Sequence, residues 1–182
     1  TTDLSVNYGR NQAPDSTGGA FNSSFAGVSI RDRTSPNMSL GTTYRRTNVH
    51  SQDTGGSPLD QTGDTVDMDM LWQPTYDVGI NLRLSYQNNR GSSTSKSIAP
   101  AANLRWQLDS ATSLTANYVF HKSRLFDPTA ALLGGDTRGL STRVTHNFTN
   151  GSFLDVAYDF QGGSAGNIEW SKQLRLTFTF NL

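Results

Sequence analysis

The hydrophobic and polar positions of this chain alternate most strictly in its last nine residues. Leu174, Leu176, Phe178, Phe180 and Leu182 fall on one face of an extended segment, and Arg, Thr and Asn fill the positions between them. Alternation with a period of two predicts a strand with one apolar and one polar face. A strand this apolar on one side favours a barrel in lipid over a soluble sheet.

The same period-two pattern recurs along the chain and predicts ten strands. They span Thr2–Arg10, Phe21–Arg31, Asn37–Thr47, Thr65–Gln73, Asp77–Asn88, Ala101–Asp109, Ser113–Lys122, Arg138–Thr149, Phe153–Gln161 and Glu169–Leu182. Most are close to the ~9–11 residues that cross a bilayer at a tilt.

The connections between these strands alternate in length. Long polar or Gly-rich loops, such as Asn48–Asp64 and Ser123–Thr137, follow the odd-numbered strands. Short links near Asp32–Pro36, Pro74–Tyr76, Ser110–Thr112 and Asn150–Ser152 follow the even-numbered ones. Long loops at one end and tight turns at the other are typical of outer-membrane barrels. We therefore expect an all-β fold, an antiparallel up-and-down transmembrane β-barrel of about ten strands in one domain, 1–182.

The final strand resembles that of the Gram-negative outer-membrane β-barrels, which carries hydrophobic residues at alternate positions back from the C-terminus. Leu182 stands here in place of the usual terminal Phe. The resemblance implies a place in the bacterial outer membrane and contact with its lipid and lipopolysaccharide. It also implies that the barrel-assembly machinery reads Leu174, Leu176, Phe178, Phe180 and Leu182. Two alternatives stay open, the C-terminal part of a larger barrel and a subunit held by partners in a larger envelope complex.

The aromatic residues predict two belts around an aliphatic band. Toward the outer strand ends we expect Tyr8, Tyr44, Tyr86, Tyr118, Phe120, Tyr158, Phe160 and Trp170, and toward the inner ends Trp72, Trp106, Phe148, Phe178 and Phe180. Aliphatic and Met side chains such as Met68, Leu82 and Val156 lie between them. Interfaces select aromatic side chains and the hydrocarbon core selects aliphatic ones, so this sorting favours a membrane barrel.

Strand parity constrains two local features. A three- or five-residue turn at Thr149–Phe153 would keep Phe148 and Leu154 on the same outer face, whereas a two-residue turn at Asn150-Gly151 would invert the following strand. In the second strand, Phe21 and Phe25 disagree in parity with Val28 and Ile30, which predicts a β-bulge near Ala26-Gly27.

The inward-facing positions carry charges of both signs. They are Asp3, Arg45, Asp67, Asp69, Arg83, Arg105, Arg143, Asp155, Asp159 and Arg175. In a narrow barrel these groups need partners, and we expect Asp67 or Asp69 to pair with Arg83, Arg143 with Asp155 or Asp159, and Arg175 with Asp155. Either the lumen is neutralised by structural ion pairs, or the charges line a path for ions or solutes.

The composition of the 182 residues narrows the function classes. No Cys is present, which removes disulfides, thiol catalysis and Cys-ligated metal. The 15 basic and 15 acidic residues balance, so nucleic acid is not expected as a partner. The sequence contains no apolar run of 18 residues, so it predicts no transmembrane helix.

Catalytic candidates are few. His50 and His121 lie at outer strand ends, and Asp67 and Asp69 start the fourth strand on the same side. The three His residues are scattered, however, without the spacing of a catalytic pair or a metal site. We predict no catalytic residues, metal or cofactor. The expected function is a non-catalytic, porin-like or conduit and scaffold barrel with a charged lumen. The alternatives are a structural or adhesion barrel that presents its loops, and an outer-membrane barrel enzyme, a protease or a lipid-modifying enzyme.

Overall fold

The computed structural model describes residues 1–182 except 15–19, 53–57, 92–93, 127–132, 165–169 and 181–182. Its ten strands are β1 (Thr2–Pro14), β2 (Ala20–Ser35), β3 (Met38–Gln52), β4 (Pro58–Thr75), β5 (Val78–Gly91), β6 (Thr94–Gln107), β7 (Thr112–Phe126), β8 (Leu133–Asn147), β9 (Phe153–Gly163) and β10 (Ser171–Thr179). Within the described ranges, no helix is long and apolar enough to cross a membrane.

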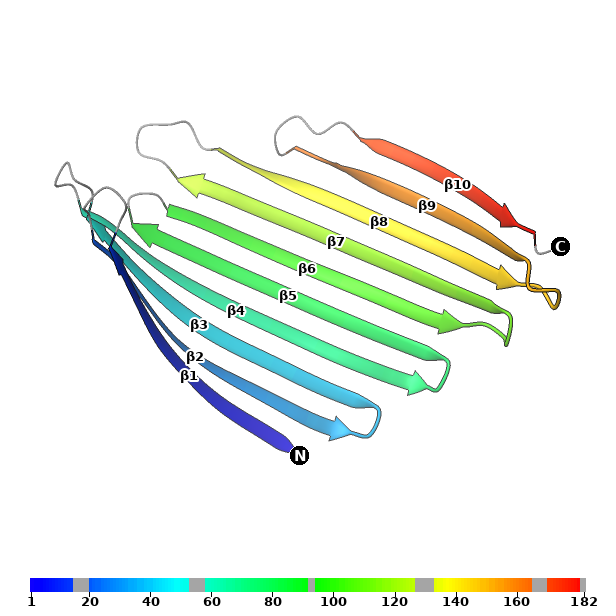
Figure 1. Cartoon of the computed structure of the whole chain (residues 1–182), viewed down its shortest axis with the longest axis horizontal. Helices are drawn as coiled ribbons and strands as arrows, with labels where there is room; N and C mark the ends of the chain where they lie inside the picture. The colour runs from blue at the N-terminus through cyan, green and yellow to red at the C-terminus, as the bar shows by residue number, and fades with distance from the viewer. Residues whose placement is uncertain (15–19, 53–57, 92–93, 127–132, 165–169, 181–182) are drawn as a thin grey trace.

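The strands form one antiparallel sheet in which each strand pairs with its neighbours in sequence, from β1 to β10 (Figure 1). This confirms the predicted all-β, up-and-down order. Among the described residues no pairing joins β1 to β10, so the sheet has two open edges. We call the end at which β1, β3, β5, β7 and β9 finish the loop end, and the opposite end the turn end.

The strands are longer than the sequence predicts, mainly at the loop end. Asn48 pairs with Thr62 and His50 with Asp60, so most of the predicted loop Asn48–Asp64 is strand, and its residues 53–57 lie outside the described part. The predicted loop Ser123–Thr137 is corrected in the same way, because Ser123 pairs with Gly135. Backbone hydrogen bonds continue here through segments that are polar on both faces, where alternation gives no signal.

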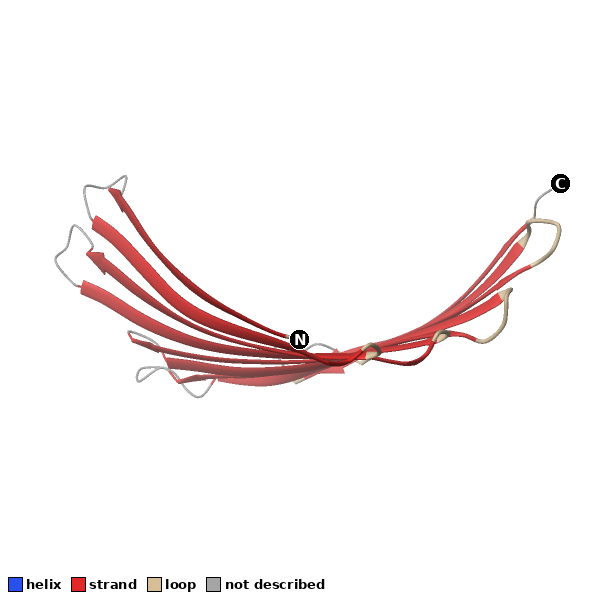
Figure 2. Ribbon diagram, turned by 90° about the horizontal axis from the view of Figure 1, so that it is seen from below, coloured by secondary structure: helices blue, strands red, loops and turns tan. Residues whose placement is uncertain are grey.

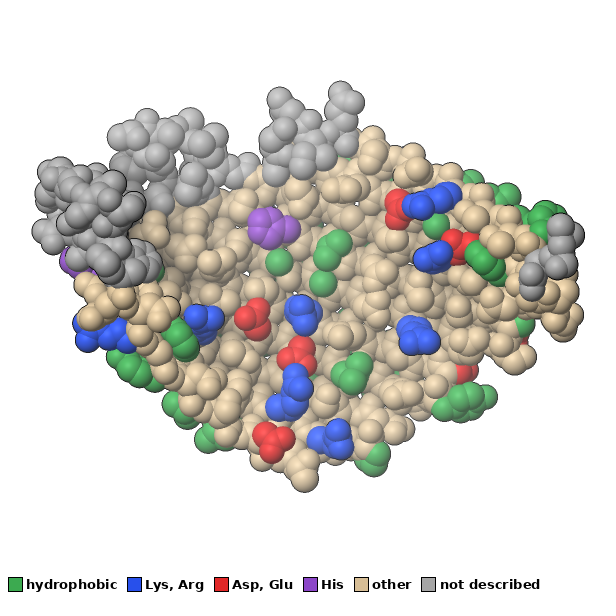
Figure 3. Space-filling view, in the orientation of Figure 1, with side chains coloured by type: hydrophobic (Ala, Val, Ile, Leu, Met, Phe, Trp, Pro, Cys, Tyr) green, Lys and Arg blue, Asp and Glu red, His purple; other side chains and the backbone are tan. Residues whose placement is uncertain are grey.

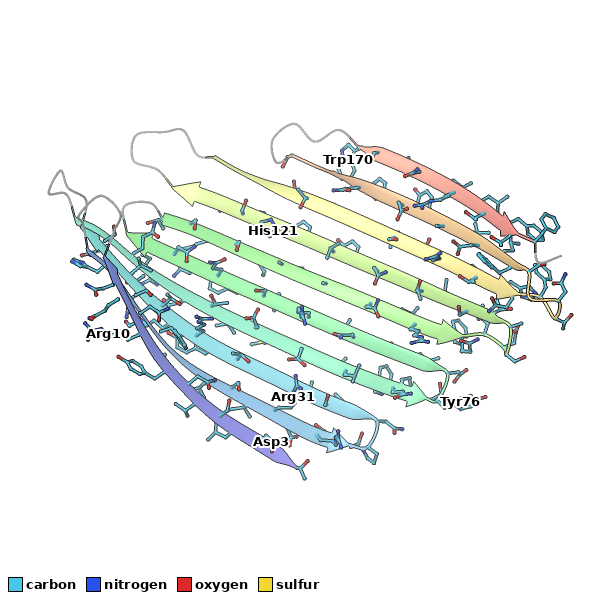
Figure 4. The ribbon with its side chains drawn as sticks, viewed as in Figure 1. Asp3, Arg10, Arg31, Tyr76, His121 and Trp170 are labelled. Carbon is cyan, nitrogen blue, oxygen red and sulfur yellow. The ribbon has the colours of Figure 1, made fainter. Side chains whose placement is uncertain are left out.

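The sheet is curved into a trough (Figure 2), and Figure 3 looks onto its concave face, on which Arg, Asp and His side chains are spread. The register places all odd-numbered residues of the paired segments on this face; Asp3 pairs with Arg31, for example, and Asp69 with Arg83. The even-numbered residues therefore share the convex face. Figure 4 shows Asp3, Arg31 and His121 on the concave side.

The sheet is a single layer without a side-chain core. Among the described residues, Ala157 is the only buried hydrophobic one. Large apolar side chains of the convex face are open instead, including Leu4, Val6, Leu174 and Leu176 at 67%, 72%, 72% and 69% exposure. Soluble domains bury such a face against a second layer, which this chain does not supply in its described residues.

The turn between β8 and β9 has the predicted length. The Phe148 amide donates to the Ser152 carbonyl at 2.8 Å, which leaves Thr149, Asn150 and Gly151 as a three-residue turn. Gly151 has a φ of 82°, in the left-handed region that favours glycine. Since His146 pairs with Leu154, Phe148 and Leu154 share the convex face, as the parity argument requires.

The bulge predicted near Ala26-Gly27 is wrong. The register of β2 runs without a shift from Ala20 to Asp32 against both neighbouring strands. Phe25 instead lies on the concave face, where the Arg45 guanidinium carbon is 4.4 Å from its ring centroid. This cation–π contact explains how the Phe25 ring is accommodated on the charged concave face. The register shifts that do occur are near the turn end, between Asp32 and Ser35 and between Trp72 and Thr75.

The strands are strongly staggered. Pairing followed across the sheet leads from Asp3, near the turn end of β1, through Arg31, Gly41, Asp69 and Arg83 to Ser171, at the loop end of β10. This is about one residue of stagger per strand. With ~3.3 Å per residue and ~4.8 Å between strands, it corresponds to a strand tilt of roughly 35°.

Candidate functional surfaces

All ten charges predicted to face inward lie at odd positions on the concave face. The sequence analysis did not name one further charge there, Arg31, although the outward parity of Val28 and Ile30 already places it on this face. With Arg31, the described paired segments carry six arginines and five aspartates on this face. They are Arg31, Arg45, Arg83, Arg105, Arg143 and Arg175, with Asp3, Asp67, Asp69, Asp155 and Asp159.

The best-formed ion pair of the concave face joins β8 and β9. The Arg143 Nε and Nη2 atoms donate to the Asp155 Oδ1 and Oδ2 atoms at 2.7 and 2.8 Å, and the Thr145 hydroxyl donates to Oδ1 at 3.0 Å. The Asp155 side chain is 7% exposed, while that of Arg143 is 59% exposed. The buried Asp155 carboxylate is thus satisfied by three donors. Of the two partners predicted for Arg143, Asp155 and Asp159, the structure shows Asp155.

A second pair spans three strands. The Arg31 Nη2 atom lies 3.4 Å from the Asp69 Oδ2 atom, although Gly41 of β3 sits between them in the register. A Cβ at position 41 would collide with the Asp69 carboxylate, so only glycine leaves this path open. The prediction that Arg83 pairs with Asp67 or Asp69 is wrong, since Asp69 reaches Arg31 and no ion pair of the described residues includes Arg83.

Three arginines share one row across the second half of the sheet. Arg105, Thr115, Arg143, Ala157 and Arg175 are paired in succession, so an arginine stands on every second strand. Arg175 contacts Asp159 at 3.7 Å, which corrects the predicted pair of Arg175 with Asp155. Small and neutral residues at the intervening positions keep the arginines about two strand spacings, ~10 Å, apart.

The concave face is hollowed across β5 to β10. A depression of about 720 Å³ is lined by small residues, Ala99, Ala101 and Gly139 among them, and by Arg83, His121 and Asp159. Short side chains leave this space, while charged and amide groups border it. The surface can therefore hold water and small polar solutes.

The convex face carries the apolar band and the aromatics expected around it. All predicted belt residues have convex parity, and Tyr44 and Tyr86 flank Val66 at one level while Trp72 and Trp106 flank Ile80 and Val78 at the other. The rings of Phe160 and Trp170 stack at 5.0 Å near the loop end, and Phe148 meets Phe178 edge-on at 5.8 Å near the turn end. Tyr8, Tyr118, Phe120, Tyr158 and Phe180 complete the two sets.

The terminal-strand residues form an open edge of the sheet. Leu174, Leu176 and Phe178 pair with Tyr158, Val156 and Leu154 on the convex face, and their other flank has no partner strand among the described residues. Phe180 follows and packs its ring against Phe178. Leu182 lies outside the described residues.

The histidines and carboxylates weighed for catalysis are not brought together. Asp67 pairs with Ser85 and Ser85 with Ala99, so His121 on β7 is three strands from Asp67, or ~14 Å. His50 bonds Asp60 on the convex face, and the His146 Nδ1 atom lies 2.8 Å from the Thr112 hydroxyl near the turn end. In the described ranges, no group of three or more potential ligand side chains could hold a metal ion.

The turn between β6 and β7 is organised by Asp109. Its Oδ1 atom accepts from the backbone N–H groups of Ala111 and Thr112 at 2.7 and 2.8 Å, and its Oδ2 atom accepts from the Thr112 hydroxyl at 2.9 Å. These bonds hold the pKa of Asp109 below its usual range because they favour the charged carboxylate, and the bond from the Ala111 N–H has the largest effect. Such an Asx-type turn closes the link without a glycine.

A scan against protein-family models finds no match for this sequence, and a search of the curated proteins finds no similar protein.

Proposed function

We propose that this chain is a non-catalytic outer-membrane β-barrel of the porin-like class, in which β10 pairs with β1 and the concave face becomes a charged lumen. The observation that carries the proposal is the convex face. Its apolar band lies between two levels of aromatic residues, and no second layer covers it in the described part of the chain. An uncovered apolar band with aromatic borders matches the outside of a barrel in lipid.

The height of the band fits a bilayer. On β5 the convex residues run from Val78 through Ile80, Leu82 and Leu84 to Tyr86, which is ~26 Å along the strand and, at a tilt of roughly 35°, ~22 Å along the barrel axis. The outward-facing band of outer-membrane barrels is ~25 Å tall. In a bilayer, lipid would thus cover the convex apolar band, which is exposed to solvent in the isolated sheet.

The stagger of the strands supports closure. A closed barrel needs strands tilted by ~35–45° to its axis. The tilt of roughly 35° derived from the spacings lies at the lower end of this range, so closure does not require a change in the register between neighbouring strands. If β1 joins β10 with their ends level, Tyr8 stands opposite Leu176 and Val6 opposite Phe178, and the apolar band continues across the seam.

The interior of this barrel is narrow and close to neutral. Ten strands are near the size at which side chains fill a barrel. Three of the six arginines form ion pairs with Asp69, Asp155 and Asp159, so much of the lumen charge is compensated. We assign to it a small, mainly structural lumen that passes little steady current, with the hollow beside Ala101 and Gly139 as its polar chamber.

The open edge of β10 supports a role in assembly. Leu174, Leu176, Phe178 and Phe180 present a row of exposed apolar side chains beside unpaired backbone groups. An edge of this kind is a template for another strand. The barrel-assembly machinery is the partner that this edge fits, and deletion of Phe180–Leu182 should leave unfolded protein in the periplasm.

The experiment is refolding of the full chain into detergent and lipid vesicles, with heat-modifiable gel migration as the test of the fold and planar-bilayer conductance as the test of the lumen. We expect a heat-modifiable species in lipid, aggregation without lipid or detergent, and a small or absent steady current. Monodisperse protein in plain buffer contradicts the membrane barrel. Large, stable, voltage-independent channels contradict the compensated lumen and indicate an open pore.

A further inference from the structure

A cluster of cations stands on the convex face at the loop ends of β6 and β7. Lys96 and Arg124 are paired directly opposite each other, and Lys122 lies two residues from Arg124 on the same face. We call these three residues the basic cluster. All three side chains are exposed. Like charges placed directly opposite in a sheet repel, so this arrangement is not explained by the stability of the sheet.

Among the described residues, the carboxylate that pairs with the basic cluster in the register is bound elsewhere. Asp136 pairs with Lys122 in the register, but its carboxylate is bound by Arg138 at 3.1 Å and by the Ser164 hydroxyl. Among the described residues, no ion pair includes Lys96, Lys122 or Arg124. The cluster therefore keeps its charge available.

A fourth cation extends the positive surface onto β5. Asn88 pairs with Lys96, and with its amide oriented so that the oxygen faces Arg90, that oxygen accepts from the Arg90 Nη2 and Nε atoms at 2.9 and 3.0 Å. Arg90 is thus held beside the cluster by a neutral group. Guanidinium and ammonium groups converging on one place are the usual means of holding a phosphate.

The level of the basic cluster relates it to the apolar band. Lys122 pairs with Ile98, which pairs with Tyr86, and Phe120 precedes Lys122 by two residues on the same face. The cations therefore begin in the row of Tyr86 and ~7 Å along β7 beyond Phe120. In a bilayer this is the level of the lipid headgroups.

The two ends of the convex face differ in charge. Among the described residues, the convex positions at the loop end carry eight basic residues, Arg10, Arg46, Arg90, Lys96, Lys122, Arg124, Arg138 and Lys172, against the acidic Asp60, Asp64 and Asp136. At the turn end the corresponding positions carry Asp32 and no Lys or Arg in the described strands. One leaflet is therefore met by a positive surface and the other is not.

We propose that Lys96, Lys122 and Arg124 bind the phosphate of a phosphorylated glycolipid in the leaflet that faces the loop end. The inference rests on the proposed membrane barrel and specifies its lipid partner. Its basis is charge complementarity at headgroup level together with the absence, among the described residues, of an ion pair to any of the three cations. A phosphate monoester carries more charge than the phosphodiester of a phospholipid, and it suits a site with several donors.

The test is lipid binding by the full chain in detergent micelles, followed by native mass spectrometry with titrated lipid A, its dephosphorylated form, phosphatidylglycerol and inorganic pyrophosphate. We expect lipid A to bind most tightly, and the K96Q/R124Q variant to bind it about tenfold more weakly. R124K should retain most of the affinity. R33Q, which removes one exposed charge near the turn end, is the matched control and should bind as the unchanged chain does.

The outcomes separate the two proposals. K96Q/R124Q must migrate as a heat-modifiable species, which we expect because removing two repelling charges does not weaken the sheet. Equal affinity of the variant and the unchanged chain for lipid A overturns this inference, and so does equal binding of the dephosphorylated lipid. Tighter binding of pyrophosphate or phosphatidylglycerol than of lipid A overturns the choice of ligand. An unchanged chain that is not heat-modifiable contradicts the membrane barrel instead.

Discussion

Arg143 and Asp155 meet at two points across β8 and β9, with donor–acceptor distances of 2.7 and 2.8 Å. The carboxylate is almost completely covered, and Thr145 supplies a third donor. The carboxylate of Asp159, by contrast, is 40% exposed and contacts Arg175 at 3.7 Å. The concave face therefore holds one firm ion pair and one loose one on the same strand.

This difference predicts unequal effects of two conservative changes. Asp155→Asn removes the charge that three donors satisfy, and should lower the free energy of unfolding by about 1.5 kcal/mol. Asp159→Asn should cost ~0–1 kcal/mol, because its pair is exposed and long. Urea unfolding of both variants in lipid vesicles measures the two costs. Equal losses would show that burial of Asp155 does not strengthen its pair.

The opposite polarity of the two faces predicts a parity effect on β5. Leu82→Arg places a charge in the middle of the convex apolar band and should cost ~2–4 kcal/mol in a bilayer. Asn81→Arg places the same charge one residue away on the concave face and should cost far less. Unfolding in vesicles compares them. Similar costs would mean that the convex face does not contact lipid.

The turn between β8 and β9 predicts a backbone effect at a single glycine. Gly151 has a φ of 82°, so Gly151→Ala should destabilise the folded chain by ~1–2 kcal/mol. Gly151→Asn should cost less, since Asn tolerates the left-handed region. Unfolding midpoints of the two variants provide the comparison. If Ala is tolerated as well as Asn, the turn does not need this conformation.

The lowered pKa of Asp109 predicts a pH dependence confined to acid. A carboxyl whose pKa is lower in the folded than in the unfolded chain stabilises above its ordinary value of 3.8, and this contribution is lost as the pH falls through the lowered value. Asp109→Ala should therefore reduce stability at neutral pH and lose less stability than the unchanged chain below about pH 4. Unfolding measured against pH checks this, and parallel curves would contradict it.

The faces of the strands could be predicted from the sequence because apolar and polar residues alternate along most of the strands. Phe148 and Leu154 show the strength of the parity argument, since it excluded the two-residue turn suggested by Asn150-Gly151. It failed at Phe25, where an aromatic ring was assumed to need the apolar face. The ring in fact contacts Arg45, a contact that depends on two strands and leaves no pattern in one.

The ion-pair partners and the strand ends could not be predicted for a related reason. Asp69 reaches past Gly41 to Arg31, and the choice between Arg31 and Arg83 depends on the space above a third strand. Beyond the apolar band, β3 and β4 show no regular alternation of apolar and polar residues, and the pairing of His50 with Asp60 rests on backbone hydrogen bonds and on a bond between their side chains. Sequence periodicity reports the environment of side chains, and where both environments are aqueous it gives no signal.

Closure of the sheet is the central claim, and a disulfide between β1 and β10 tests it most directly. With the strand ends level, Asn7 stands opposite Thr177 and Ser5 opposite Thr179, on the concave face. The chain has no cysteine, so each double variant contains a single thiol pair. We predict that N7C/T177C and S5C/T179C form an intramolecular disulfide in folded protein in lipid, and that N7C/F178C, which points to opposite faces, does not. Disulfides that form only between two chains, or in neither matched variant, would contradict the closed barrel.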